Sequence, residues 1–405
     1  MKTNKLFKRL IVDDLLKYIN TDDVLVLHGA RQVGKTSILY YLRDVLKAEK
    51  QPVYYADLED SRLKNVLDAG PGEFLKHLRE EGYEPGKKLF VFIDEIQYLK
   101  NPSAFLKLTA DHYKNLKLVV SGSSSFEIKT KFKDSLAGRT LEFEVFNLSF
   151  KEFMLFKGKP LPESAGALTA GRVEELKALY KEYALYGGYP KVVLAASREL
   201  KEKYLQQIID TYIRKDIGDL AKIKDAGKFN KLLEVLAAQS GNLLNVKELA
   251  GTCRLAQATV EKYLFILENT YVIRLLRPFS GNLRSELFKV PKIFFYDTGL
   301  MQLLWMKSLL KEVMGNVFET SVFAELVKKY GKDAVFYWRS KDKKEIDFIL
   351  KRRGVILPLE AKINFQRFEP GAIKYFNGKY GLKDHRIVGL SGEPRGKSSV
   401  YPWQV

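Results

Sequence analysis

Residues 24–42, which read VLVLHGARQVGKTSILYYL, constrain the fold more strongly than any other stretch of the chain. The apolar run at 24–28 predicts a buried β-strand, and the helical spacing of apolar residues after Gly34 predicts an α-helix. The segment between them, 29–36, has the Walker A form G-x-x-x-x-G-K-[ST]. When a strand, such a loop and a helix follow one another, backbone N–H groups and the helix N-terminus converge on phosphate oxygens. We therefore predict a P-loop that binds a nucleoside triphosphate.

The residues of this loop have different predicted roles. Lys35 is expected to reach the outer phosphates and take part in catalysis, and Thr36 is expected to place its hydroxyl on Mg²⁺. The expected cofactors are therefore ATP and Mg²⁺. The predicted ATP-binding residues are Gly29, Ala30, Arg31, Gln32, Val33, Gly34, Lys35, Thr36 and Ser37.

An acidic pair follows a second apolar run, LFVFID at 89–94. This run predicts a buried strand that ends at Asp94, where a Walker B carboxylate can hold the Mg²⁺ shell of the nucleotide. The next residue, Glu95, is placed to polarise an attacking water. One strand, 52–58, precedes this run along the chain after the P-loop strand, and the adjacent pair suits the ATPase branch with an inserted central strand. A bound nucleotide with only a structural role is the alternative, and the intact acidic pair argues against it.

Two further candidates in this region are less specific. Ser123, after the predicted strand 116–122, is a candidate catalytic sensor of the γ-phosphate or the attacking water, and an ordinary Ser/Gly loop is the alternative. Arg139 precedes the predicted strand 141–146, where a neighbouring subunit could receive it as a catalytic arginine finger. Its alternative is a surface arginine beside a turn glycine.

A helix-turn-helix pattern occupies the middle of the chain, from 229 to about 280. Two helices, a turn, a longer helix at 256–268 and a strand pair predict a winged helix. On the longer helix, Val260, Leu264 and Leu267 share one face and are expected to pack inward. The exposed residues Gln257, Thr259, Glu261 and Lys262, together with Glu268, make a poor major-groove reader. Non-specific contact through Lys247, Arg254 and Arg274, or a role in domain packing, is the alternative to sequence reading.

Two short motifs near the C-terminus, EIDFIL and PLEAK, fall on predicted adjacent strands. They could bring Asp347, Glu360 and Lys362 to one edge, where two carboxylates and an ammonium can bind Mg²⁺ or Mn²⁺ and activate water. This arrangement resembles the PD-(D/E)xK nuclease fold, in which a preceding helix often supplies another metal-binding Glu. Glu319 is the candidate, with Glu325 as its substitute. Ile346 stands where the full motif has proline, and the alternative is a salt-bridged, inactive scaffold used for docking.

Composition favours polyanionic partners. Lys and Arg number 68 against 49 Asp and Glu, a formal charge of +19, which raises the expectation of nucleic acid, chiefly DNA bound without sequence specificity. No run approaches the roughly eighteen apolar residues of a membrane span, and the N-terminal segment does not resemble a secretory signal, so we expect a cytoplasmic protein with no membrane partner. The single cysteine, Cys253, excludes an internal disulfide or a thiolate metal cluster.

A set of motifs spread along the chain points to a known family. The segments GARQVGKTSIL, FIDEIQYL, SGSSSFE, LAGR, FNLSFKEF, GGYP and IRKDI resemble the archaeal and bacterial predicted ATPases of the AAA superfamily that carry a conserved C-terminal domain of uncertain function. The resemblance implies an AAA-type ATPase at the N-terminus, nucleotide-dependent conformational change and assembly into a homo-oligomer, as a ring or otherwise.

These observations predict an α/β protein: an AAA-type parallel sheet, a helical lid, a winged helix-turn-helix and a restriction-endonuclease-like α/β domain. The predicted domains are 1–150, 151–228, 229–285 and 286–405, in that order. The first functional hypothesis is an Mg²⁺-dependent ATPase coupled to nucleic-acid binding or processing. Cleavage of DNA by the C-terminal domain would be an additional activity. The alternative is a slow ATP-dependent switch whose inactive nuclease-like scaffold binds a protein partner.

Overall fold

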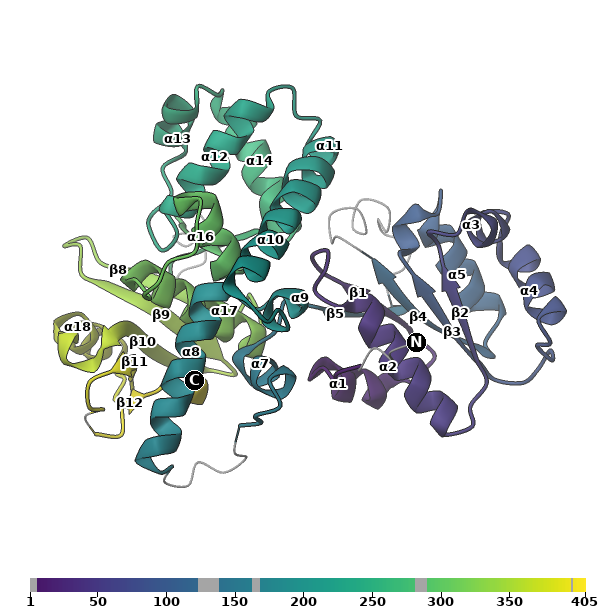
Figure 1. Cartoon of the computed structure of the whole chain (residues 1–405), viewed down its shortest axis with the longest axis horizontal. Coiled ribbons are helices and arrows are strands. Elements are labelled where there is room, and N and C mark those ends of the chain that lie inside the picture. The colour runs from purple at the N-terminus through teal and green to yellow at the C-terminus, as the bar shows by residue number, and fades with distance from the viewer. Residues whose placement is uncertain (1–5, 123–137, 162–167, 281–289, 395) are drawn as a thin grey trace. The chain divides into compact units, whose positions relative to one another are not determined.

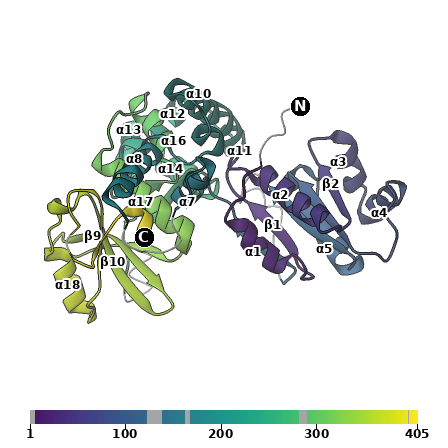
Figure 2. The same ribbon diagram turned by 60° about the horizontal axis from the view of Figure 1, so that its bottom comes forward.

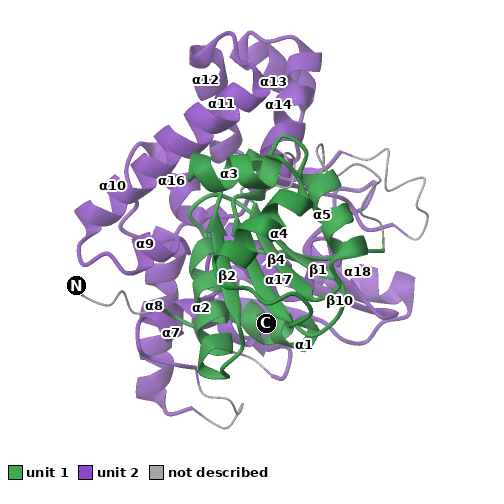
Figure 3. Cartoon of the chain, turned by 90° about the vertical axis from the view of Figure 1, so that its right-hand side faces the viewer, with its two compact units in different colours: residues 1–146 green, residues 147–405 purple. Residues whose placement is uncertain are grey.

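The computed structural model describes residues 6–122, 138–161, 168–280, 290–394 and 396–405, and its elements are labelled in Figure 1. The chain divides into two compact units, residues 1–146 and 147–405, coloured separately in Figure 3. This division falls four residues before the predicted boundary at 150. The predicted boundaries at 228 and 285 lie inside the second unit and stay predictions.

The first unit is built on a five-stranded parallel sheet, as predicted. Its order is β2-β3-β4-β1-β5. The strand inserted in space between the P-loop strand β1 and the Asp94 strand β3 is therefore β4, while β2 lies at an edge. The strands are β1 (Val24–His28), β2 (Val53–Asp57), β3 (Leu89–Asp94), β4 (Leu116–Gly122) and β5 (Thr140–Glu144).

Helices cover both faces of this sheet. Val24 and Val26 of β1 pack in one apolar cluster with Leu67, Phe74 and Leu106, which come from α3, α4 and α5. Because successive side chains of a strand alternate between faces, the buried residues between them face the side on which α2 contacts β3 and β4. Burial on both faces explains why the central strands read as continuous apolar runs. The helices are α1 (Ile11–Tyr18), α2 (Lys35–Ala48), α3 (Ser61–Asp68), α4 (Pro71–Glu80), the 3₁₀ turn η1 (Ile96–Tyr98) and α5 (Pro102–His112).

The second unit begins with helices. They are α7 (Phe150–Phe156), α8 (Ala170–Tyr186), α9 (Pro190–Val193), α10 (Arg198–Ile208), the π-helical segment η2 (Ile209–Asp216) and α11 (Ile217–Ala221). Three more helices follow, α12 (Ala226–Ala238), α13 (Val246–Cys253) and α14 (Gln257–Asn269), and then an antiparallel pair, β6 (Ile273–Leu276) and β7 (Lys292–Phe295). On α14, Val260, Leu264 and Leu267 are buried.

A second sheet lies in the C-terminal part of this unit. Its order is β12-β11-β10-β9-β8, antiparallel from β8 to β10 and parallel from β10 to β12. Helix α17 packs against β10, and α18 packs against β9 (Figure 2). These elements are α16 (Thr298–Met306), α17 (Gly315–Tyr330), β8 (Val335–Arg339), β9 (Glu345–Arg352), β10 (Val355–Asn364), η3 (Phe365–Arg367), α18 (Gly371–Tyr380), β11 (Arg386–Ser391), β12 (Ser399–Val400) and η4 (Pro402–Gln404).

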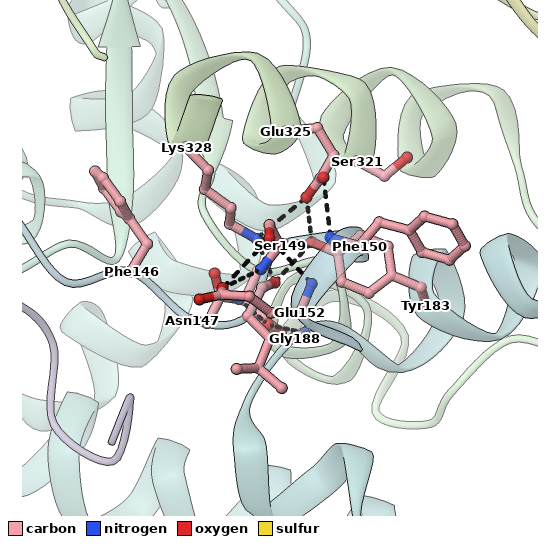
Figure 4. A network of polar contacts seen from close by, with 12 residues as sticks. Phe146, Asn147, Ser149, Phe150, Glu152, Tyr183, Gly188, Ser321, Glu325 and Lys328 are labelled. Atoms are coloured by element: carbon pink, nitrogen blue, oxygen red, sulfur yellow. Dashed lines mark hydrogen bonds and ion pairs between the residues drawn. The ribbon is translucent and has the colours of Figure 1, made fainter. Parts of the chain in front are cut away.

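A buried polar network joins distant segments of the second unit (Figure 4). The Asp297 carboxylate accepts hydrogen bonds from Gly188 N at 2.9 Å and from Asn147 Nδ2 at 2.5 Å, and it caps α16 by accepting from Leu300 N at 2.9 Å. Burial raises the pKa of Asp297. The network therefore gathers the sequence motifs FNLSFKEF and GGYP, and the segment YDTGL at 296–300, around one carboxylate.

Gly299, the second residue of α16, is a position where any side chain should be costly. A Cβ there would lie 2.4 Å from the Tyr186 carbonyl oxygen and 3.0 Å from Leu205 Cδ1. We expect Gly299→Ala to lower the free energy of unfolding by about 1–3 kcal/mol, the usual effect of overpacking, in denaturant titration. Gly315→Ala is the matched control, because its Cβ meets no atom within 4 Å. Equal stabilities of the two variants would contradict this account.

Candidate functional site

The predicted P-loop lies between β1 and α2, at the carboxyl edge of the first sheet. Gly34 adopts a left-handed backbone conformation with φ of 98°, which glycine accepts without strain. Lys35 is the first residue of α2, and its buried Nζ donates to the backbone oxygens of Ala30 at 2.7 Å and Gly29 at 3.2 Å. Burial lowers the pKa of Lys35 to about 8, against the opposing effects of Glu95 and Asp94. The loop is thus folded around the ammonium group that is expected to meet phosphate.

Two contacts outside the motif brace this loop. A Cβ on Gly29 would lie 2.0 Å from the carbonyl oxygen of Val145. Only glycine therefore fits beside the backbone that follows β5. The buried Arg9 guanidinium donates to the carbonyl oxygens of Val33 at 2.7 Å and Phe146 at 2.9 Å. Arg9 was missed from the sequence because nothing in its local pattern marks it.

The Asp94 carboxylate ends β3 and is held by residues of the two neighbouring strands. Tyr55 of β2 donates its hydroxyl to Oδ2 at 2.9 Å, and Ser121 of β4 donates to Oδ1. Burial, and then the Asp94 charge, raise the pKa of Tyr55, so the phenol stays a donor. Both partners escaped the sequence analysis, because each depends on which strand lies beside β3.

Glu95 follows directly, with a left-handed backbone φ of 56°. Non-glycine residues adopt this conformation rarely, and it often accompanies functional sites. Gln97 donates its amide to Glu95 Oε2. Burial raises the pKa of Glu95, while the charge of Lys35 lowers it. The acidic pair and Lys35 therefore interact electrostatically within one site.

The two remaining candidates of the first unit are Ser123 and Arg139. Ser123 lies outside the described residues. Arg139 precedes β5 at the amino edge of the sheet, because its carbonyl accepts from Val24 N at the start of the parallel strand β1. Its Nε donates to Asp111 Oδ1 at 2.7 Å. The role of Arg139 as an arginine finger stays a prediction.

The predicted residues of the C-terminal sheet do come together. Leu359 of β10 pairs with Phe348 of the antiparallel β9, so Glu360 lies beside Asp347. Lys362 Nζ lies 3.0 Å from Asp347 Oδ2 and 2.7 Å from Glu360 Oε2. The Ala361 backbone N–H also donates to Asp347 Oδ2, at 2.9 Å.

Glu319 of α17 completes this group through a residue that the sequence analysis missed. Lys292 Nζ, at the start of β7, lies 3.3 Å from Glu319 Oε1 and 2.6 Å from Glu345 Oε1. Glu325, the named substitute, instead accepts from Phe150 N and Tyr183 OH in the network of Figure 4. We call Lys292, Glu319, Glu345, Asp347, Glu360 and Lys362 the acidic cluster.

The charges of the acidic cluster are strongly coupled. Burial and the neighbouring Asp347 raise the pKa of Glu319 to about 7 and that of Glu360 to about 8. Burial also opposes ionisation of Asp347, yet Lys362 and Lys292 hold its pKa below the usual range. Asp347 is therefore the carboxylate that carries the negative charge most readily.

The predicted metal ligands Glu319, Asp347 and Glu360 do not fit a divalent ion as they stand. Among the residues that the structure describes, no three His, Cys, Asp or Glu side chains are arranged to hold one. The physical reason is that two ammonium groups lie between the carboxylates and bridge them in pairs.

Comparison with known proteins gives the class of the first unit. Residues 21–154 match the family model described as an AAA domain. With the parallel sheet and the P-loop, this match makes the first unit an AAA-type P-loop ATPase domain. Residues 177–310 and 314–401 match two models described as domains of unknown function, DUF8612 and DUF4143 respectively.

Relatives match the chain over most of its length. An uncharacterised protein of Haemophilus influenzae is 28% identical over 355 residues, covering 85% of this chain and 84% of that protein. An uncharacterised protein of Methanocaldococcus jannaschii is 27% identical over 366 residues, covering 85% and 79%. Among solved structures, the Walker-type ATPase PABY2304 of Pyrococcus abyssi is similar with a TM-score of 0.43 and 16% identity, covering 74% of this chain and 95% of that one.

None of the helices in the described ranges has the length and apolar character needed to cross a bilayer.

Proposed function

We propose that the first unit hydrolyses ATP with Mg²⁺, at a site formed by the P-loop and the Asp94-Glu95 pair. The observation that carries this proposal is the acidic pair at the carboxyl end of β3, which one inserted strand, β4, separates from the P-loop strand. The Thr36 hydroxyl and the Asp94 carboxylate are oxygen donors of the kind that Mg²⁺ prefers. When bound, Mg²⁺ would neutralise charge on the phosphates.

The chain's own groups would carry the remaining steps. Lys35 would exchange its bonds to Ala30 and Gly29 for phosphate oxygens, and the loop N–H groups would hold the same phosphates. Glu95 would orient the attacking water and accept its proton. Tyr55 and Ser121 would keep Asp94 in place. Ser123 and Arg139 remain our proposed sensor and in-trans finger.

We further propose that the second unit binds nucleic acid without sequence specificity. The formal charge of +19 on the whole chain supports this, as does the order of α12, α13, α14, β6 and β7, which suits a winged helix. Arg274 is engaged by Glu268 at 3.1 Å and Asp333 at 3.5 Å, so the exposed Lys247 and Arg254 are better placed for phosphate contact.

The test is ATP turnover of the full chain with and without duplex, forked and single-stranded DNA, at two salt concentrations. We expect DNA to raise turnover, and added salt to weaken the effect because phosphate contacts release counterions. Turnover that ignores DNA at both salt concentrations would contradict the nucleic-acid role and leave the ATPase proposal standing. A nucleotide-binding chain with no turnover in any condition would contradict the ATPase proposal itself.

The second candidate is an ATP-dependent switch that binds a protein partner. The favouring observation is a groove of about 810 Å³ beside α14, lined largely by apolar residues and flanked by Phe265, which is 56% exposed. The exposed Glu261 on the same helix disfavours DNA there. In this candidate function, the residues around Asp347 and Glu360 form a nuclease-like scaffold that does not cleave. DNA-independent turnover would favour it.

A further inference from the structure

Lys292 is a buried cation whose ion-pair partners, Glu319 and Glu345, are distant in the sequence. It begins β7, its side chain is 3% exposed, and its backbone pairs with Leu276 of β6 and bridges to Leu243. Its Nζ reaches Glu319 of α17 and Glu345 of β9. One ammonium group therefore ties a strand of the small antiparallel pair to a helix and a strand of the C-terminal part of the unit.

The acidic cluster is nearly neutral without any added ion. Lys292 bridges Glu319 and Glu345, and Lys362 bridges Asp347 and Glu360. Arg339 adds a third cation, with Nη1 3.3 Å from Glu345 Oε2. Four carboxylates thus face three basic groups. A buried charge is tolerated when it is paired and hydrogen-bonded, and here the protein supplies the partners.

A divalent cation would compete with these ammonium groups for the same carboxylates. Mg²⁺ and Mn²⁺ bind oxygen ligands at close range and favour carboxylates. One oxygen of Glu319 and one of Asp347, Oε1 and Oδ2, already contact an ammonium nitrogen, at 3.3 Å and 3.0 Å. A dication placed between them would also meet the positive charge of Lys292, which is held in a dry environment where repulsion is weakly screened.

We infer that Lys292 takes the place of a divalent cation in the acidic cluster, so that the second unit closes this site with its own ammonium group. Lys292 then acts as an internal counter-ion that fastens β7 to α17 and β9. This inference concerns the second unit alone, and it does not depend on nucleotide hydrolysis by the first.

The first arm of the test uses the wild-type full chain without nucleotide. Mn²⁺ binding is followed by electron paramagnetic resonance of the free ion, and the unfolding temperature is measured in chelator and in Mn²⁺. We expect the wild-type acidic cluster to bind no Mn²⁺, so the Asp347→Asn variant should bind as much Mn²⁺ as the wild type. The wild-type unfolding temperature should be the same in chelator and in Mn²⁺.

The second arm uses Lys292→Met, which removes the ammonium and keeps most of the side-chain volume. We expect this variant to unfold at a lower temperature in chelator than the wild type does. It should bind one Mn²⁺ per chain that the wild type does not bind, and it should recover stability when Mn²⁺ binds. Adding Asp347→Asn should abolish that gain. Lys311→Met, at an exposed position, is the control and should gain nothing.

If Lys292→Met does not fold, the charge-balanced double variant Lys292→Gln with Glu345→Gln replaces it, since this pair of changes removes one cation and one carboxylate together. One Mn²⁺ bound by the wild-type chain through Asp347 would overturn the inference. A folded Lys292 variant that gains no Mn²⁺ would overturn it as well.

Discussion

Replacing Glu95 by Gln is expected to lower ATP turnover about 100-fold or more, while ATP binding is retained. The reason is geometric. Glu95 directly follows Asp94, the last residue of β3, and its backbone has a left-handed conformation. Gln97 donates a hydrogen bond to one of its carboxylate oxygens. An amide of the same shape keeps these contacts but cannot accept the proton of the attacking water.

Turnover and nucleotide affinity should be measured on the same preparations. Glu49→Gln, just after α2 at an exposed position, is the matched control and should behave as wild type. If Glu95→Gln turns over as fast as the control, water activation does not depend on Glu95, and the possibility that bound nucleotide has only a structural role would return.

Replacing Asp297 by Ala is expected to lower the free energy of unfolding by about 3 kcal/mol or more, because three buried donors lose their acceptor. These donors are Gly188 N, Leu300 N and Asn147 Nδ2. The effect should appear in chemical denaturation of the full chain as a shift of the unfolding midpoint to lower denaturant concentration.

Two comparisons separate this mechanism from a general effect of removing a carboxylate. Asp333→Ala deletes a side chain that is 86% exposed and weakly paired with Arg274, so its cost should be below about 1 kcal/mol. Asp297→Asn keeps one acceptor oxygen and removes the buried charge, and its cost should lie between the two. An Asp297→Ala variant as stable as Asp333→Ala would contradict the role of the network.

The features that the sequence predicted well are those written in short, contiguous patterns. The P-loop, the strand that ends at Asp94 and the parallel sheet follow from local motifs and from apolar runs, and the sheet is confirmed. The convergence of Asp347, Glu360 and Lys362 could also be anticipated, because both motifs fall on strands that are joined by a tight turn.

The features that the sequence did not reveal depend on contacts between distant residues. Ser121 meets Asp94 only because β4 is inserted beside β3, and strand order is not written in the periodicity of either strand. Nothing in the sequence around Lys292 marks it, and its ion pairs with Glu319 and Glu345 are seen only when β7 is placed against α17 and β9. The sequence analysis named one ammonium group, Lys362, beside the carboxylates, and the second one, Lys292, becomes visible only in the folded chain.

The position of Arg9 has a practical consequence for anyone who shortens the protein. A chain that began at Val12 would keep the full G-x-x-x-x-G-K-T motif and every strand of the first sheet. It would nevertheless lack the guanidinium that satisfies the Val33 and Phe146 carbonyls. Weak nucleotide binding by such a fragment would then reflect a damaged loop, and should not be mistaken for a property of the intact chain.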